Sequence, residues 1–379
     1  MDLDQFLDAG GADLPALVAK VDSTIGLRPD DFLLVIGSLV EGLGTSRSDL
    51  DLLLITPRPD HLLPEEDEIA LVVGRCLADV RVLPLAELEK LLARLDRWSS
   101  EPWAVSHATR FTLQERVLLH RLLHGRLILH SERSDPAAVP RPAEETVARL
   151  KLHVARHLSR TVQVDMAGHR DAGDPASLVF AAQDLLGHAV DALTAGHGLT
   201  NPNPKWRSRL LEWVPADWEA ALGIRPSGRS AAELVWQLHR APERPEMGAA
   251  LEHALRITAF ARAVFVWAER RLVRASAVDA DPPSWPRLER HPTDTLLPHL
   301  DLDVDFLLAD GGALVARLNS FGTPLRLSPP EFALALLFDG VTTAREAEVV
   351  VCGTDSRVPG TGPAHELVSR IMATNLSAP

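Results

Sequence analysis

The sequence predicts an α+β protein with a mixed-sheet domain at residues 1–138, an all-helical bundle domain at 143–275 and a small α+β module at 287–379. Short apolar runs of strand length alternate with helical patterns up to about residue 135. From residue 143 to about 275, apolar residues recur with the helical period. After a stretch rich in proline and acidic residues at 278–286, two apolar runs flank Gly311-Gly312, which is typical of a hairpin.

In the first domain, the apolar run at 32–36 ends in Gly37-Ser38, which indicates a buried strand followed by a tight turn. Pro57 and Pro59 end the next strand, because proline cannot donate a hydrogen bond to a sheet. We expect strands at 32–36, 50–55, 79–83 and 127–130, and helices at 14–21, 65–76, 85–95 and 110–124.

The second domain follows a proline-rich linker at 136–142, and its helical periodicity is clearest at 147–158, 178–193 and 251–273. Its main interruption, Asn-Pro-Asn-Pro-Lys-Trp-Arg at 201–207, predicts a rigid turn, because proline fixes the backbone. This turn places Lys205 beside Trp206 at the start of a further helix. An ordinary surface lysine explains the pattern equally well, because lysines are mostly exposed.

The third module is predicted to contain a hairpin with strands at 304–308 and 313–318. Ser-Pro-Pro-Glu at 328–331 has the composition of a helix start, with a capping serine and an acid three residues later. Asp339-Gly340 predicts a turn into a second helix. The alternating acids at 301–305 have no Gly-Ser turn before them, and we expect them to form a solvated strand edge.

The composition restricts the classes of molecule that the protein is expected to bind. Its 379 residues contain 39 Lys and Arg against 52 Asp and Glu, which gives a formal net charge of -13. This balance disfavours a broad surface for long nucleic acids and leaves small molecules or peptides. Cys76 and Cys352 form neither a metal-ligand spacing nor a disulfide framework. The acidic N-terminus and the lack of a long apolar run predict a cytoplasmic protein with no membrane partner.

Other chemical motifs are weak or absent. His120 and His124 have helical spacing, as have His153 and His157, but neither pair has a third metal ligand nearby. We expect both pairs at helix surfaces or domain interfaces. The sequence contains no Gly-x-Ser-x-Gly elbow and no phosphate-binding Gly-Lys-Ser/Thr pattern.

The strongest pattern combines Gly37-Ser38 with two carboxylates, Asp49 and Asp51, at the start of an apolar run. Residues two apart on a strand lie on one face, roughly 7 Å from each other, so both carboxylates are directed to one place. Asp79, on a predicted neighbouring strand, is a candidate third carboxylate. Carboxylates suit Mg²⁺, whose coordination shell substrate phosphates complete. The alternative is an ordinary polar strand face.

With these residues the chain resembles the DNA polymerase β-type nucleotidyltransferase superfamily, including its aminoglycoside- and small-molecule-modifying members. The shared pattern is a strand, Gly-Ser, a glycine-containing loop, Ser-Asp-x-Asp and a later strand carboxylate. The matching residues are Gly37, Ser38, Ser48, Asp49, Asp51 and Asp79. The resemblance implies a transferase that moves a nucleoside monophosphate, AMP from ATP by default, to a hydroxyl group and releases pyrophosphate.

The resemblance also implies a division of roles. Asp49, Asp51 and Asp79 would hold two Mg²⁺ ions about 4 Å apart, with ATP as co-substrate. Asp79 would bind the activating ion or take the proton of the acceptor hydroxyl. Gly37 and Ser38 would bind the β- and γ-phosphates.

Further roles are implied outside the central pattern. Ser48 would position the strand that carries the two acids. Lys205 would contact the triphosphate from the helical domain, which closes over the substrate in such enzymes. Glu145 would be a hydroxyl-activating base, and Arg149 or Lys151 a phosphate contact. An exposed ion pair between Glu145 and Arg149 explains their spacing without any function.

The sequence leaves open the identity of the acceptor and the role of the third module. An aminoglycoside, another natural product, a peptide or a protein would each suit the predicted chemistry, since a fold does not specify its substrate. The module at 300–350 resembles winged-helix modules that recognise leader peptides, and a purely structural cap is the alternative. Two competing functions are a non-catalytic nucleotide-binding or antitoxin-like protein and a tRNA-end nucleotidyltransferase.

Overall fold

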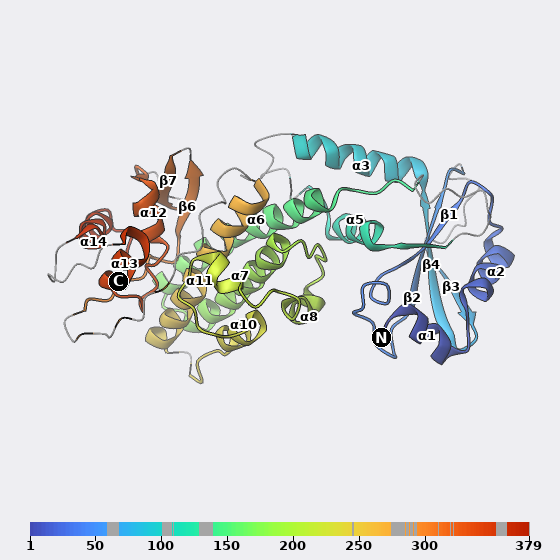
Figure 1. Cartoon of the computed structure of the whole chain (residues 1–379), viewed down its shortest axis with the longest axis horizontal. Helices are drawn as coiled ribbons and strands as arrows, with labels where there is room; N and C mark the ends of the chain where they lie inside the picture. Colours follow the sequence, from blue (N-terminus) through green and yellow to red (C-terminus); the bar gives the residue numbers. More distant parts are fainter. Residues whose placement is uncertain are drawn as a thin grey trace. The chain divides into compact units, whose positions relative to one another are not determined.

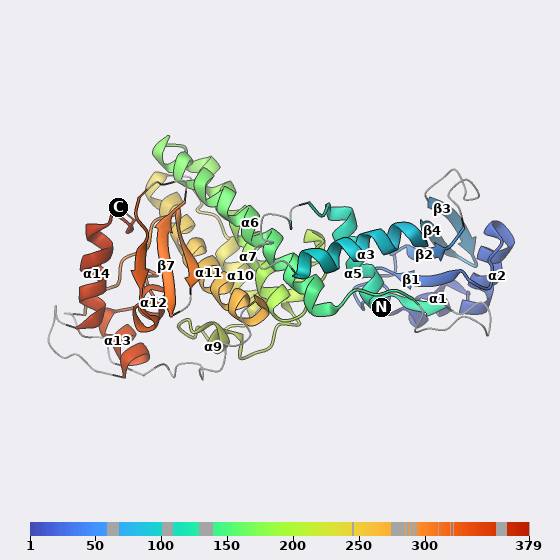
Figure 2. The same ribbon diagram turned by 90° about the horizontal axis from the view of Figure 1, so that it is seen from above.

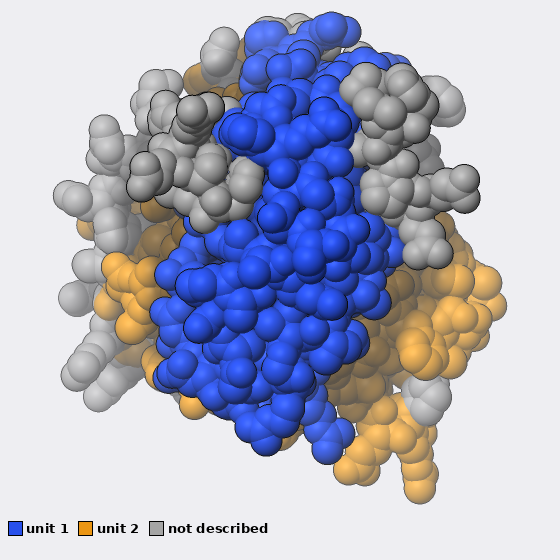
Figure 3. All heavy atoms as spheres, turned by 90° about the vertical axis from the view of Figure 1, so that its right-hand side faces the viewer, with its two compact units in different colours: residues 1–147, 200–206 blue, residues 148–199, 207–379 orange. Residues whose placement is uncertain are grey.

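The computed structural model describes residues 1–58, 68–100, 108, 110–128, 139–244, 246–273, 285, 288, 291, 294–309, 311–318, 320, 322–353 and 362–378. The chain divides into two compact units, coloured separately in Figure 3. The first contains Met1–Val147 and the short segment Thr200–Trp206, and the second contains Ala148–Leu199 and Arg207–Pro379. The predicted division into three domains stays a prediction.

The first unit is built on a mixed five-stranded sheet in the order β3-β4-β2-β1-β5 (Figure 1). Strands β2 and β4 are parallel, and the other neighbours are antiparallel. The strands are β1 (Phe32–Ile36), β2 (Leu50–Thr56), β3 (Glu68–Val73), β4 (Cys76–Pro84) and β5 (Arg126–Ile128). The predicted strands at 32–36, 50–55 and 79–83 are confirmed, and residues 129 and 130 of the fourth lie outside the described part.

The helices of this unit are α1 (Leu3–Gly10), α2 (Leu14–Ile25), α3 (Leu85–Ser100) and α5 (Leu113–His124). Side chains from α1 and α2, such as Phe6 and Leu17, form one core with Leu50, Leu52 and other residues of one sheet face. Because side chains alternate across a strand, Asp51 lies on the opposite face. Helix α5 contacts β1 next to that face, so it can reach Asp51.

The helix predicted at 65–76 is wrong, and the described part of this segment, from Glu68, is strand. Ile69, Leu71 and Val73 belong to the core or pack against it, which is the two-residue alternation of a half-buried strand. Gly74, with φ of 62°, then turns the chain into β4. A short apolar run fits either a strand or a helix, and here pairing with β4 decides the outcome.

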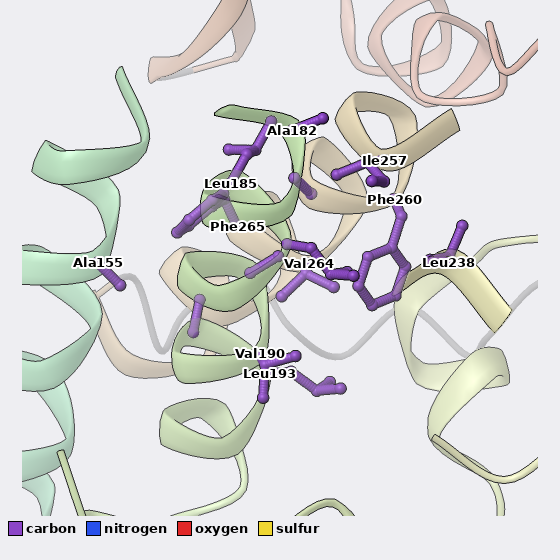
Figure 4. Packing of buried hydrophobic residues seen from close by; sticks show 14 of the residues in the cluster. Ala155, Ala182, Leu185, Val190, Leu193, Leu238, Ile257, Phe260, Val264 and Phe265 are labelled. Carbon is purple, nitrogen blue, oxygen red and sulfur yellow. The ribbon is translucent and has the colours of Figure 1, made fainter. Parts of the chain in front are cut away.

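The central region is helical, as predicted, with α6 (Glu144–Asp171), α7 (Pro175–Gly196), α8 (Arg207–Leu211), α9 (Trp218–Leu222), α10 (Ala231–His239) and α11 (Met247–Val273). Figure 4 shows how α7 and α11 pack, with Leu185 and Val190 beside Val264 and Phe265. These long helices are stabilised by this shared apolar core. None of the described helices combines the length and apolarity that a membrane crossing requires.

The C-terminal part contains a three-stranded antiparallel sheet in the order β6-β7-β8, with three helices beside it (Figure 2). Its elements are β6 (Val304–Ala309), β7 (Gly312–Arg317), β8 (Leu325–Leu327), α12 (Pro329–Ala335), α13 (Ala344–Cys352) and α14 (Pro363–Ala373). The predicted hairpin strands and both helix starts are confirmed, with a capping box between Ser328 and Glu331.

The expectation that the acids at 301–305 form a solvated strand edge is wrong. Asp301 and Asp305 are only 2% and 6% exposed. Arg156 and Arg160 on α6 both pair with Asp305, at 2.8 and 2.9 Å. Arg262 on α11, also buried, donates to the carbonyl oxygen of Val304 at 2.8 Å. The aspartates therefore join the small sheet to the helical core, and arginines cap an edge of β6 that would otherwise offer unpaired carbonyl groups.

Candidate functional site

The site is organised around Asp51, on the sheet face opposite α1 and α2. In the register of the sheet, Asp51 lies between Ile36 at the end of β1 and Asp79 on β4. Because β2 and β4 are parallel, Asp51 and Asp79 are nearest neighbours on one face, at the usual strand spacing of about 4.8 Å. The predicted neighbouring carboxylate is therefore present in register. Asp49 is exposed just before β2.

Gly37 makes room for the carboxylate of Asp51. Its φ of 81° is a left-handed conformation that favours glycine. A β-carbon at this position would overlap Oδ2 of Asp51. The Gly37-Ser38 turn thus passes directly beside the Asp51 carboxylate. Residues 38–42 form turns rather than a helix.

Replacing Gly37 by alanine tests this close approach, with Gly42→Ala as the matched control. Gly42 also has a positive φ, of 72°, but no atom lies within 4 Å of a β-carbon placed there. Both variants should lose about 1–2 kcal/mol of stability through backbone strain. Only Gly37→Ala also displaces Asp51, so calorimetry should show loss of Mg·ATP binding in that variant alone. Equal affinities in the two variants would contradict the assigned role of Gly37.

Two cations act on the same carboxylate. Arg121 on α5 places Nη2 3.5 Å from Oδ2 of Asp51. Burial is the main cause that raises the pKa of Asp51, and the negative charges of Asp79 and Asp49 raise it further. The positive charges of Arg121 and Lys205 lower it. The three aspartates and two cations therefore share one electrostatic environment. Lys205 belongs to the segment Thr200–Trp206 of the first unit, and its ammonium lies over the ring of Trp206.

The serines of the predicted pattern lie on the loop between β1 and β2. Ser38 is half-buried, and its carbonyl oxygen accepts a hydrogen bond from the backbone N–H of Leu43 at 2.9 Å. Oγ of Ser48 accepts one from the N–H of Thr45 at 2.9 Å. Ser48 thus fixes the turn immediately before Asp49, and its role in positioning the strand stays a prediction.

Two of the three carboxylates, Asp51 and Asp79, decide whether the site can hold a metal ion. Among the described residues, no group of three or more His, Cys, Asp or Glu side chains is arranged to hold an ion. Mg²⁺ needs only one or two protein carboxylates when substrate phosphates and water complete its shell. Asp51 and Asp79, adjacent in register and on one face, meet that requirement, with Asp49 beside Asp51 in the same field.

The residues predicted on the first helix of the bundle lie on α6. Glu145 is exposed and Arg149 is half-buried. Lys151 is buried, and its ammonium donates to Oγ1 of Thr194 at 2.8 Å and to the carbonyl oxygen of Leu199 at 2.9 Å. Burial lowers the pKa of Lys151 to about 8. In this structure Lys151 therefore ties α6 to the end of α7, and its role as a phosphate contact stays a prediction.

Sequence reasoning missed two features of this unit. Arg121 had no motif to reveal it, although it precedes the predicted strand at 127–130 by only six residues. The loop after Gly37-Ser38 carries a single acid, Glu41, whose side chain is 8% exposed and whose Oε2 lies 2.8 Å from Nε2 of His120. His120 is 3% exposed. It is therefore buried inside the first unit, whereas we expected it at a helix surface or domain interface.

His153 gives the second unit a pH dependence. Burial, then Arg149 and Arg160, lowers its pKa to about 4. Between pH 6.5 and 4 the unfolded chain binds the extra proton, so stability falls with falling pH by roughly 3 kcal/mol from this group. His153→Gln should reduce the pH dependence of a urea-unfolding profile in this window, and the remainder comes from groups such as His197, whose pKa burial also lowers to about 4. The exposed His157→Gln should leave the profile unchanged. A wild-type profile that is flat over this window would refute the assignment.

Comparisons with known proteins add no assignment. No protein-family model matches the chain, and no curated protein matches its sequence significantly.

Proposed function

We propose that this chain is a magnesium-dependent nucleotidyltransferase of the DNA polymerase β type. It transfers a nucleoside monophosphate, AMP from ATP, to a hydroxyl group of a small molecule or peptide and releases pyrophosphate. The observation that carries the proposal is the Gly37-Ser38 turn beside Asp51, with Asp79 next to Asp51 in register. A polar strand face alone would need neither a glycine that spares the carboxylate nor a second acid beside it.

The residues have distinct roles in this proposal. Asp51 and Asp79, with Asp49, would hold Mg²⁺, which would neutralise the triphosphate and lower the pKa of the acceptor hydroxyl. Gly37 and Ser38 bind β- and γ-phosphate oxygens through backbone N–H groups and the serine hydroxyl. Arg121 and Lys205 supply positive charge beside the carboxylates.

The reaction forms one bond and breaks one. The acceptor oxygen attacks the α-phosphorus of ATP, the bond from that phosphorus to the bridging oxygen breaks, and pyrophosphate leaves with the bond's electron pair. Asp79 is the carboxylate that orients the acceptor hydroxyl and takes its proton, because it lies next to Asp51 in the register of the sheet.

Two further parts of the proposal concern the partners. The net charge of -13 favours a small molecule, such as a natural product, or a peptide as acceptor. The C-terminal sheet and helices are proposed to form a winged-helix-like module that follows a substrate-closing helical domain. Both described cysteines, Cys76 and Cys352, are free thiols, which is consistent with a cytoplasmic location.

Calorimetry with Mg·ATP, followed by a pyrophosphate-release screen over aminoglycosides, other hydroxylated natural products and peptides, tests the proposal. Binding should be in the micromolar to millimolar range typical of substrates and should be lost on adding EDTA. No binding at millimolar Mg·ATP would contradict the proposal and favour an antitoxin-like interaction protein. Tight tRNA binding with a steep salt dependence would instead favour a tRNA-end enzyme.

A further inference from the structure

A buried polar network connects the three segments that surround Asp51. Its centre is Glu41, on the loop that begins with Gly37-Ser38. Oε2 of Glu41 accepts a hydrogen bond from Nδ2 of Asn201 at 2.8 Å and lies 2.8 Å from Nε2 of His120 on α5. Oγ1 of Thr200 lies 2.8 Å from Nδ1 of His120 and 3.1 Å from Nε2 of His124. We call these five residues the Glu41 network, and all belong to the first unit.

Thr200 is bonded to both histidines, and Glu41 accepts from Asn201. Burial pushes the pKa of Glu41 up, but its interactions with His120, Asn201 and His124 outweigh burial, so the pKa of Glu41 is lowered. A buried carboxylate is costly to leave without its donor, which makes the arrangement specific.

Two hydrogen bonds from backbone N–H groups to asparagine side chains extend the network to Lys205. Asn201, held by Glu41 through Nδ2, uses Oδ1 to accept from the N–H of Asn203 at 3.0 Å. Oδ1 of Asn203 in turn accepts from the N–H of Lys205 at 3.2 Å. Two consecutive Asx turns therefore fix the backbone from Asn201 to Lys205. Pro202 is the middle residue of the first turn and Pro204 that of the second, and each restricts the backbone further.

Each segment joined by Glu41 carries a group of the candidate site. The loop carries Gly37 and Ser38, α5 carries Arg121 next to His120, and the segment Thr200–Trp206 carries Lys205. Arg121 and Lys205 both act on Asp51.

We propose that Glu41 is a positioning residue that, through Asn201 and Asn203, fixes the backbone of Lys205 before nucleotide binds, so that the Lys205 ammonium stays within electrostatic range of the Asp51 carboxylate. This inference rests on the proposed function. Preorganisation reduces the ordering cost of binding, so the network should act on the affinity for Mg·ATP more than on the rate of transfer from bound ATP. Glu41 acts through Lys205, and the two side chains should therefore be energetically coupled.

Hydrogen exchange without nucleotide tests the first half of the inference. In Glu41→Ala, the amides of Asn203 and Lys205 should exchange at least about tenfold faster than in wild type, because their acceptors lose their anchor. Asp31→Asn is the matched control, since Asp31 is also a buried acid of the first unit, paired with Arg58 at 2.6 Å. It should lower stability without a selective change at those two amides. Unchanged exchange in Glu41→Ala would overturn the positioning role whatever the protein binds.

A double-mutant cycle with Mg·ATP tests the second half. Glu41→Ala and Lys205→Ala should each weaken binding about tenfold or more, and the double variant should be little weaker than either. Glu41→Gln, which keeps one acceptor oxygen, should recover part of the loss. Additive effects, or faster exchange with unchanged affinity, would overturn the positioning role. A wild type that binds no Mg·ATP would instead overturn the proposed function, because the exchange result does not depend on nucleotide.

Discussion

Asp51→Asn is expected to lower the rate of nucleotidyl transfer by about a thousandfold or more while the protein stays folded. The carboxylate is the common neighbour of Asp79, Gly37 and Arg121. An amide of the same shape cannot supply its charge to a metal ion. Burial and neighbouring acids raise the pKa of Asp51, which means that the ionised form is disfavoured in the free protein. Its removal should therefore leave the melting temperature unchanged or slightly higher.

The measurement is pyrophosphate release with the acceptor that the screen identifies, alongside thermal unfolding of each variant. Asp96→Asn is a suitable control, because Asp96 is an exposed acid on α3 of the same unit. It changes the net charge by the same amount and should retain wild-type turnover. An Asp51→Asn protein that is folded and still turns over at more than about a tenth of the wild-type rate would refute the assigned chemistry.

Local patterns in the sequence predict the strands that bring Asp51 and Asp79 together. Strand β1 begins and ends where its apolar run does, at Phe32 and Ile36. Asp79 was placed on a neighbouring strand because β4 has a strand composition of its own. The partners of Glu41 could not be predicted, since His120 and Asn201 are 79 and 160 residues away along the chain. No local pattern encodes such pairings.

Two predictions that the structure contradicts, for residues 65–76 and 301–305, failed because they too depend on contacts with other parts of the chain. The segment at 65–76 fits helix and strand almost equally, and only its pairing with β4 decides between them. The acids at 301–305 looked like solvent-facing residues because charged groups are seldom buried without partners. Their partners are arginines on α6, more than 130 residues earlier in the chain, and Arg317 on β7. Burial of charge is therefore a tertiary property, whereas strand length and helix capping are local ones.

Asp305→Ala is expected to destabilise the second unit by about 3–5 kcal/mol, because it removes one partner of a buried ion pair. Burial by itself would raise the pKa of Asp305, yet Arg156 and Arg160 lower it overall, so the carboxylate is ionised. Arg156 is 3% exposed and would keep only Glu269 as a counter-charge. Urea unfolding at pH 7 measures the loss. Asp303→Ala is the control, since its partner Arg317 is 26% exposed, and it should cost about 1 kcal/mol or less.

The double variant Arg156→Met/Asp305→Leu distinguishes a buried charge left alone from a lost contact. If the cost of Asp305→Ala comes mainly from an uncompensated guanidinium, removing both charges should recover much of it, because apolar replacements of buried ion pairs are often nearly neutral. Recovery should be incomplete here. Nη2 of Arg156 also donates to the carbonyl oxygen of Phe306 at 2.9 Å, and methionine leaves that edge of β6 without its donor. A double variant as unstable as Asp305→Ala would show instead that packing around Asp305, rather than charge, joins the small sheet to the helices.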